Sequence, residues 1–403
     1  MSFSLKTFIL RCIHYPSKFI YPLIPVRVPE LISGPGAVRE LPESVKSQKI
    51  DKVLIVTDKG LTSIGLAEKI TGPLEAANIP YCIFDGVQPN PSIQNIEDGL
   101  KVYDENNCSG IIAFGGGSPM DCAKMIGARA SNRRKPVRKM QGKFRVWRTL
   151  PPLIAIPTTA GTGSEGTVAA VVSDPDTHEK FAVIDLKLVP QVAILDAELM
   201  LGLPPHVTST TGMDALTHAV ESYIGLMGTP FTRKNSLDAT KIIMEDLEDV
   251  YQDGSNPDKR DQLALASYYA GLAFTRTWVG YVHAIAHNMG GLYGVPHGLA
   301  NAIILPYVLE ASIEQARDKL ADLAVVSGLG RADYFKDVLA RKFIDKIKRM
   351  NQNMGIPTFI KELKEEDIPL IVKRALAESN IDYPVPRIMN KQELTELVRQ
   401  LLP

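Results

Sequence analysis

A divalent-metal site is indicated by the types and spacing of four side chains in the second half of the chain: Asp214, His218, His283 and His297. Asp214 and His218 are four residues apart, so on a helix both project from one face, one turn apart. His283 and His287 repeat this spacing in a second apolar segment, and His297 follows shortly afterwards. Each residue alone also fits a helix cap or a satisfied polar group. Their combination favours a metal site.

Such a site would supply Lewis-acid chemistry. A bound divalent ion stabilises a negatively charged oxygen, and on zinc the pKa of a bound water falls to about 7. One carboxylate and three neutral imidazoles leave the centre positive, with room for a substrate oxygen. These ligands suit Fe(II), Zn(II), Ni(II) and Mn(II), and intrinsic affinity favours zinc over Fe(II). Because imidazole binds metal only when neutral, we expect metal loss at acidic pH.

A glycine-rich segment in the first half of the chain follows an apolar run and opens a helical pattern. It contains Gly115, Gly116, Gly117, Ser118 and Asp121. Three glycines allow a sharp turn and a close approach to a ligand, and the N–H groups at a helix start can hold phosphate. The segment lacks the G-x-G-x-x-G pattern and the Lys-Ser/Thr of a P-loop. Since a plain turn rarely needs three consecutive glycines, the segment predicts phosphate binding.

A second glycine- and threonine-rich segment also follows a predicted strand. Its hydroxyls, among them Thr158, Thr159 and Thr162, suit a diphosphate or a ribose. Asp58, just after the first predicted strand, could accept from ribose hydroxyls and repel a 2′-phosphate, although its spacing also fits a helix N-cap. Lys180 could contact phosphate or ribose, or be a solvated lysine.

The order of predicted elements indicates two domains, as expected for 403 residues. Strands expected at 52–57, 81–84, 110–114, 153–156 and 192–195 alternate with helices such as 64–77 and 93–106, which predicts a parallel sheet with crossover helices. After Pro204 and Pro205 helical periodicity dominates, for example at 236–251, 260–274 and 318–326. We therefore expect an N-terminal α/β dinucleotide-binding domain at 1–200 and an all-α metal-binding domain at 201–403.

Composition and the N-terminal segment indicate the class of partner, the cellular location and the relation to membranes. Basic and acidic residues number 45 each, which argues against a nucleic-acid partner. Four cysteines without a C-x-x-C pair fit a reducing, cytoplasmic location. The basic, apolar segment 1–29 is too interrupted to span a bilayer and lacks a signal-peptide pattern. We expect an arm packed on the protein; a membrane-surface helix is the alternative.

The chain resembles the iron-containing, or group III, alcohol dehydrogenase family. The matching motifs lie, in family order, at 33–37, 115–121, 157–163, 212–218 and 283–301. The resemblance implies a dehydroquinate-synthase-like fold and an NAD-dependent enzyme, with NADP less favoured. It implies Fe(II)-assisted interconversion of primary alcohols or diols and aldehydes, in a homodimer or larger homo-oligomer.

The resemblance also implies roles for individual residues. The family's metal ligands correspond to Asp214, His218, His283 and His297, and His287 corresponds to a proton-transfer residue near the nicotinamide. The implied cofactor contacts are Asp58, which favours NAD over NADP, together with Gly115, Gly116, Gly117, Ser118, Asp121, Thr158, Thr159, Thr162 and Lys180.

Two departures keep the substrate open. Many family members carry Asn and small residues where this chain has Arg276 and Trp278, so substrate preference does not transfer.

The first alternative function is a polyol dehydrogenase or a hydroxyacid–oxoacid transhydrogenase with another divalent metal. A dehydroquinate-synthase-type lyase would need a cluster of basic residues, which we do not identify. A non-catalytic metal- or nucleotide-binding protein is disfavoured by the complete ligand set and His287.

Overall fold

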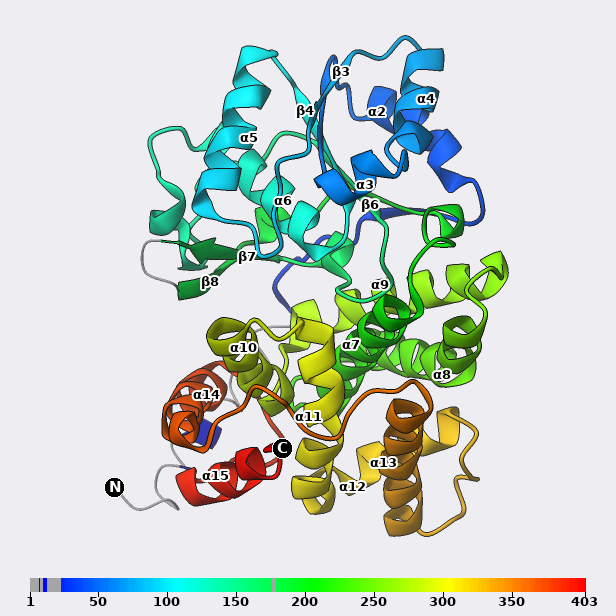
Figure 1. Ribbon diagram of the computed structural model, residues 1–403, viewed down its shortest axis with the longest axis vertical. Coiled ribbons are helices and arrows are strands. Elements are labelled where there is room, and N and C mark those ends of the chain that lie inside the picture. Colours follow the sequence, from blue (N-terminus) through cyan, green and yellow to red (C-terminus); the bar gives the residue numbers. More distant parts are fainter. Residues whose placement is uncertain (1–6, 8–9, 13–22, 176–178) are drawn as a thin grey trace. The chain divides into compact units, whose positions relative to one another are not determined.

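The computed structural model describes residues 7, 10–12, 23–175 and 179–403 (Figure 1). The chain divides into two compact units. The α/β unit contains Val26–Leu203 and Gly254–Tyr268, and the helical unit contains Met1–Pro25, Pro204–Asp253 and Tyr269–Pro403. No helix in the part of the chain that the structure describes is both long and apolar enough to cross a membrane.

These units differ from the expected division at residue 200 in two segments. Residues 254–268 join the α/β unit, because the Ser267 hydroxyl accepts from the Gly163 N–H at 3.2 Å and the Tyr268 hydroxyl donates to the Pro29 carbonyl at 3.1 Å. The N-terminal arm groups with the helical unit, where Arg11 donates to the carbonyls of Val385 and Pro386. Most of the segment considered for a membrane-surface helix lies outside the described residues.

The core of the α/β unit is a six-stranded sheet in which all neighbours pair in parallel, in the order β1-β9-β6-β4-β2-β3. The strands are β1 (Glu30–Ser33), β2 (Val53–Val56), β3 (Tyr81–Phe84), β4 (Gly110–Gly115), β6 (Leu153–Pro157) and β9 (Val192–Leu195). Five were predicted and are confirmed. The edge strand β1 was missed, because four partly exposed residues give no apolar run.

Both faces of this sheet are covered, which explains the continuous apolar runs of its strands. Val53 and Ile55 pack on the side of α2 (Leu41–Ser47) and α4 (Glu68–Ala76). Leu54 and Val56 pack in a second core cluster with residues of α5 (Ile93–Glu105) and α6 (Gly117–Ser131). These two helices lie on the opposite side of the sheet from α2 and α4 (Figure 1). The sheet therefore forms the rigid centre from which the loops at its carboxyl edge project.

The helix expected at 64–77 is wrong at its beginning. Gly65 has φ +75°, a left-handed conformation that ends helices, so α3 (Lys59–Ser63) stops before it and α4 begins at Glu68. A small second sheet was also not predicted; it has the order β5-β8-β7. Its strands are β5 (Gly142–Lys143), β7 (Ala169–Asp174) and β8 (Glu179–Ile184).

The helical unit confirms the all-α prediction, since residues 204–403 are all described and contain no strand. Prolines in the first helical turn set several starts, and Thr229 adds a capping box to α8. The three expected helices lie inside the longer α8, α9 and α12. The elements are α7 (Pro205–Ile224), α8 (Pro230–Gln252), α9 (Pro257–Thr277), α10 (Tyr281–Tyr293), α11 (His297–Ala311), α12 (Ile313–Val326), α13 (Lys336–Asn353), α14 (Ile368–Asp382) and α15 (Lys391–Arg399).

Candidate active site

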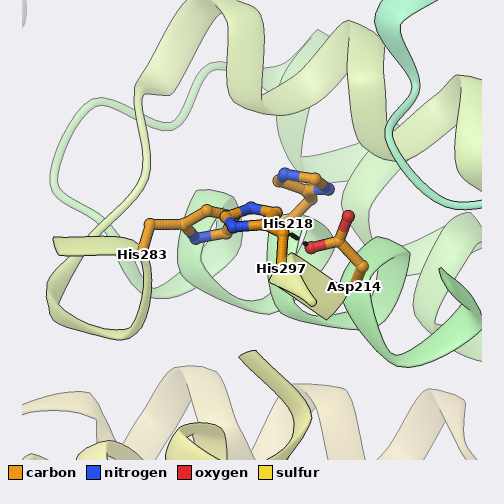
Figure 2. Close-up of side chains that lie close together, drawn as sticks. All are labelled: Asp214, His218, His283 and His297. Carbon is orange, nitrogen blue, oxygen red and sulfur yellow. Dashed lines mark ion pairs between the residues drawn. The ribbon is translucent and has the colours of Figure 1, made fainter. Parts of the chain in front are cut away.

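The four predicted metal ligands converge within the helical unit (Figure 2). Asp214 and His218 project from one face of α7, His283 comes from α10, and His297 is the first residue of α11. One candidate ligand atom from each of the four lies within 4.8 Å of all the others. Nε2 of His297 is 3.7 Å from a carboxylate oxygen of Asp214.

The donor set fits a divalent metal ion. It combines one carboxylate with three imidazoles, and Asp214, His218 and His283 are buried while His297 is half-exposed. Burial lowers the pKa of His283 well below its ordinary value, and the neighbouring histidines add to this effect. A neutral imidazole keeps the lone pair that a metal requires. The arrangement would therefore place four donors around one small volume.

Glu221 fixes the orientation of His283. It lies on α7 one turn beyond His218, and its Oε2 is 2.6 Å from Nδ1 of His283. The carboxylate also accepts from the N–H groups of Gly280 and Val282, each at 2.8 Å. Burial raises the pKa of Glu221 to about 7, while these N–H groups oppose that effect. With Nδ1 engaged, Nε2 of His283 is the nitrogen directed to the cluster.

Asn301 contacts three of the four ligands. It lies on α11 one turn after His297, and its Nδ2 donates to a carboxylate oxygen of Asp214 at 2.6 Å. The same nitrogen is 3.2 Å from Nε2 of His283 and 3.1 Å from Nε2 of His297. Asn301 thereby links α7, α10 and α11 around the cluster.

Neither Glu221 nor Asn301 was predicted from the sequence as a site residue. The signal was present, because Asp214, His218 and Glu221 follow the spacing i, i+4, i+7 on one helix face. His297 and Asn301 repeat the i, i+4 spacing. Phe274 was also missed as a site residue; its ring stacks on His218 with centroids 4.1 Å apart.

His287, the predicted proton-transfer residue, lies beside the cluster. Its ring centroid is 5.5 Å from that of His297, and the two planes differ by 13°. Its Nδ1 is 2.8 Å from Oε1 of Glu378 on α14. His287 is therefore held by a carboxylate, as His283 is, but from a different helix.

The two glycine-rich segments of the α/β unit end neighbouring strands. Gly115 at the end of β4 pairs in register with Pro157 at the end of β6, and the Thr158 N–H donates to the Gly115 carbonyl at 3.1 Å. The predicted phosphate-binding residues that follow these strands therefore share one edge. β2 and β4 are neighbours at the point where the strand order reverses, which is where ligands bind in open α/β sheets.

The three glycines of the first loop have different structural requirements. Gly115 has φ +143°, and a Cβ there would meet the Pro119 ring at 2.6 Å. A Cβ on Gly117 would meet Cγ2 of Thr162 at 2.9 Å. Gly116 has φ −79°, and its Cβ would lie at an ordinary 3.5 Å from Thr159. The protein's own packing therefore does not require glycine at 116, unlike at 115 and 117.

Lys124 anchors the second loop from inside the protein. Its buried ammonium donates to the Ser164 carbonyl, the Thr167 carbonyl and hydroxyl, and the Ala169 carbonyl, among other acceptors. Burial lowers the pKa of Lys124 to about 8, and Asp121 and Glu165 oppose that effect. The loop is thus fixed by an internal cation.

Asp121 has an internal role that the sequence did not suggest. One carboxylate oxygen accepts from the Ser164 hydroxyl at 3.0 Å and the other from the Val171 N–H at 2.9 Å. Burial raises its pKa, and Lys124 counteracts this. Asp121 thereby positions the second loop, a role additional to its predicted contact with the cofactor.

The other predicted cofactor residues lie at the same edge of the sheet or near it. Asp58 follows β2 and caps α3, accepting from the Leu61 N–H at 3.1 Å, so the capping alternative is realised. The Ser118 hydroxyl accepts from the Asn90 N–H at 3.2 Å, and Lys180 donates to the Asn90 side chain at 2.9 Å. Asn90 was not predicted, yet it joins these two residues.

Arg276 and Trp278 have different surroundings. The Arg276 guanidinium donates to the Leu272 carbonyl and lies 4.8 Å from the Phe231 ring centre, so part of its charge is engaged within the helical unit. Trp278 has φ +65°, an unfavourable conformation for an aromatic residue, just before the Gly280 N–H that Glu221 binds.

Comparisons with known proteins agree with this geometry. Residues 29–197 match the family described as iron-containing alcohol dehydrogenase, and residues 208–402 match the C-terminal family of Fe-containing alcohol dehydrogenases. The 1,3-propanediol dehydrogenase of Klebsiella pneumoniae is 40% identical, covering 91% of this chain and 95% of that protein. The NAD-dependent methanol dehydrogenase of Bacillus methanolicus is 36% identical, with 93% and 98% covered.

Comparison with solved structures identifies the same family. The crystal structure of a 1,3-propanediol oxidoreductase matches with a TM-score of 0.89 at 39% identity, covering 93% of this chain and 98% of that one. The matches extend over both units and include all the predicted site residues. The chain belongs to the iron-containing alcohol dehydrogenase family and is an alcohol dehydrogenase.

Proposed function

We propose that this enzyme interconverts short primary alcohols or diols and their aldehydes, using NAD and a divalent metal ion, in the first place Fe(II). The convergence of Asp214, His218, His283 and His297 carries this proposal. Membership of the family supports iron, and the printed name of the methanol dehydrogenase supports NAD. The donor types also suit zinc, which is the second candidate.

In this proposal the four clustered side chains hold the ion, with Glu221 and Asn301 orienting them. When bound, the ion supplies Lewis-acid stabilisation of the alcohol oxygen as its proton leaves. His283, neutral because it is buried, would offer the lone pair of Nε2 to the ion while Glu221 holds Nδ1. His287 is the candidate proton carrier, since its ring lies next to that of His297.

The dinucleotide is proposed to bind at the carboxyl edge of the parallel sheet. Gly116 lets its phosphates approach the backbone at the start of α6, where the N–H groups favour anions. The hydroxyls of Thr158, Thr159 and Thr162 and the Lys180 ammonium are proposed as further contacts. The Asp58 carboxylate, at the end of β2, is proposed to select NAD over NADP by charge.

The substrate class is proposed from the relatives. Their names specify 1,3-propanediol and methanol, which share a primary alcohol on a short carbon chain. A polyol or a hydroxyacid–oxoacid couple is the alternative. We also propose a cytoplasmic location, which the pattern of the four cysteines favours, and a homo-oligomeric state, which the family implies. Cell fractionation and analytical ultracentrifugation would test them.

The decisive experiment combines metal analysis with a substrate panel. Protein purified without oxygen should contain about one equivalent of iron or zinc and form NADH with 1,3-propanediol or methanol. His283→Ala should abolish both metal binding and turnover. The matched control is His206→Ala, which removes an exposed histidine at the start of α7 and should leave both unchanged. Full activity of His283→Ala would refute the ligand assignment.

A further inference from the structure

A carboxylate and a phenol accompany His287, and the proposed function does not use them. The Glu378 carboxylate on α14 lies 2.8 Å from Nδ1 of His287 on α10. The Tyr383 hydroxyl, just after α14, donates to the same oxygen of Glu378. The three groups form a hydrogen-bonded chain, Tyr383–Glu378–His287. The imidazole of His287, at one end of this chain, stacks on His297, one of the four proposed metal ligands.

The surroundings of Glu378 favour its ionised form. Its side chain is 30% exposed. Burial alone would raise its pKa, but the interactions with His287 and the hydrogen bond from Tyr383 outweigh that effect and lower the pKa below its ordinary value. An ionised carboxylate at this distance makes a strong, directional contact with an imidazole N–H.

This contact determines which nitrogen of His287 can accept a proton. A neutral imidazole that donates from Nδ1 to a carboxylate carries its lone pair on Nε2. After protonation at Nε2, the same carboxylate stabilises the imidazolium without taking the proton itself. Oxidation of a primary alcohol by NAD yields an aldehyde, NADH and one proton. That proton would pass to Nε2 of His287 and then to solvent.

A second contact between α10 and α14 does not involve His287 and serves as a control for the Glu378 contact. The Tyr293 hydroxyl, at the end of α10, donates to the carboxylate of Asp367 immediately before α14, at 2.7 Å. This second phenol–carboxylate pair links the same two helices but does not include His287. If Glu378 only joined helices, removing either carboxylate would have the same consequence.

We propose that Glu378 is the positioning residue that sets the tautomer and orientation of His287 for proton transfer, and that Tyr383 holds Glu378 in place. This inference rests on the proposed function of His287 as proton carrier. It assigns a role in the reaction to helix α14 and the residue that follows it, although both are distant in sequence from the metal motifs.

The test compares Glu378→Gln with the matched control Asp367→Asn in the metal-loaded enzyme, with 1,3-propanediol and NAD. We expect Glu378→Gln to lower kcat by roughly 10- to 100-fold, with metal content and KM little changed. Tyr383→Phe should have a smaller effect in the same direction. Asp367→Asn and Tyr293→Phe should leave kcat close to that of the wild type.

Two further measurements separate positioning from stability. In a His287→Asn background, Glu378→Gln should cause no further loss of kcat, because a residue that acts through His287 has nothing left to orient. In ¹⁵N-histidine spectra of the full chain, Glu378→Gln should change the tautomer signature of His287, and Asp367→Asn should not. Additive losses of kcat, or an unchanged tautomer, would overturn the proposal.

The wild-type assay distinguishes failure of the proposed function from failure of the role of Glu378. If the wild type with bound metal forms no NADH from any primary alcohol, the proposed function fails. If the wild type is active and Glu378→Gln has the same kcat, the proposed function stands and the positioning role of Glu378 is wrong.

Discussion

Glu221 and His283 form a buried pair in which Oε2 of the carboxylate lies 2.6 Å from Nδ1 of the imidazole. Carboxylates in this position hold a metal-binding histidine in one tautomer and raise its basicity. We expect Glu221→Gln to weaken metal binding by about 10- to 100-fold. Competition with a chelator, read out by metal analysis, measures this change.

The control for that variant is Tyr223→Phe. Tyr223 lies on the same helix and donates to Asp322 at 2.9 Å, so its loss perturbs α7 without contacting the cluster. Metal affinity of Tyr223→Phe should match the wild type. Equal weakening by both variants would show that general loosening of α7 determines affinity, and not the bond to His283.

Asp58 combines two roles that substitution can separate. Its carboxylate caps α3 and is also proposed to repel a 2′-phosphate. Asp58→Asn keeps a capping oxygen and removes the charge, so we expect the preference for NADP relative to NAD to rise roughly tenfold, equivalent to about 1.4 kcal/mol. The ratio of kcat/KM for the two cofactors measures it.

The control in this case is Asp85→Asn. Asp85 follows the adjacent strand β3 and accepts from the Thr62 hydroxyl at 3.1 Å. It should leave cofactor preference unchanged. An unchanged ratio for Asp58→Asn would assign the residue to capping alone.

Gly116 and Gly117 should respond differently to alanine. Gly116→Ala has ordinary φ and room within the protein, so we expect normal folding but weakened NAD binding. In Gly117→Ala the new Cβ forces Thr162 to move, which should cost about 1–3 kcal/mol of stability. Calorimetric titration with NAD and thermal unfolding distinguish the two effects. Tight NAD binding by Gly116→Ala would contradict phosphate binding at this loop.

Lys124 should be important for stability. Lys124→Met leaves the carbonyls of Ser164, Thr167 and Ala169 buried without their donor, and Asp121 without its cation. We expect a loss of roughly 3–5 kcal/mol, because breaking a buried ionic network leaves charges uncompensated.

Urea unfolding measures the effect of Lys124→Met, and Lys46→Met provides the comparison. Lys46 forms an exposed pair with Glu43 on α2 and should contribute at most about 1 kcal/mol. If Lys124→Met and Lys46→Met lowered the free energy of unfolding equally little, the buried network around Lys124 would not be what fixes the 164–169 loop.

The predictable part of the fold is the part whose pattern is local. Fully buried strands such as β2 and β4 have apolar runs, and both were located to within a residue. The β7–β8 pair was missed because apolar residues of β7 occupy exposed as well as buried positions, as Val171 does, so the sequence shows no apolar–polar alternation. Residues 254–268 follow a helical pattern that does not reveal their unit; tertiary contacts such as those of Ser267 and Tyr268 do so.

In the candidate site, too, local spacing was predictable from the sequence and tertiary contacts were not. Asp214 and His218 share a helix, so spacing was sufficient to pair them. Glu378 lies 91 residues from His287 in sequence, and no periodicity connects α14 with α10. Asp121 shares a motif with the glycines, but no local pattern shows that its carboxylate accepts hydrogen bonds from Ser164 and Val171 inside the unit.

The contacts of Asn301 bear on how the enzyme acquires its metal. Together with Glu221, this amide ties the ligand-bearing helices to one another through the protein alone. Nitrogen and oxygen donors of these types bind several first-row ions, and selection among them depends partly on which metal is available. Which ion the enzyme carries would then reflect the supply in the growing cell. The same polypeptide, produced in media that differ in iron and zinc, would then be isolated with different metal contents.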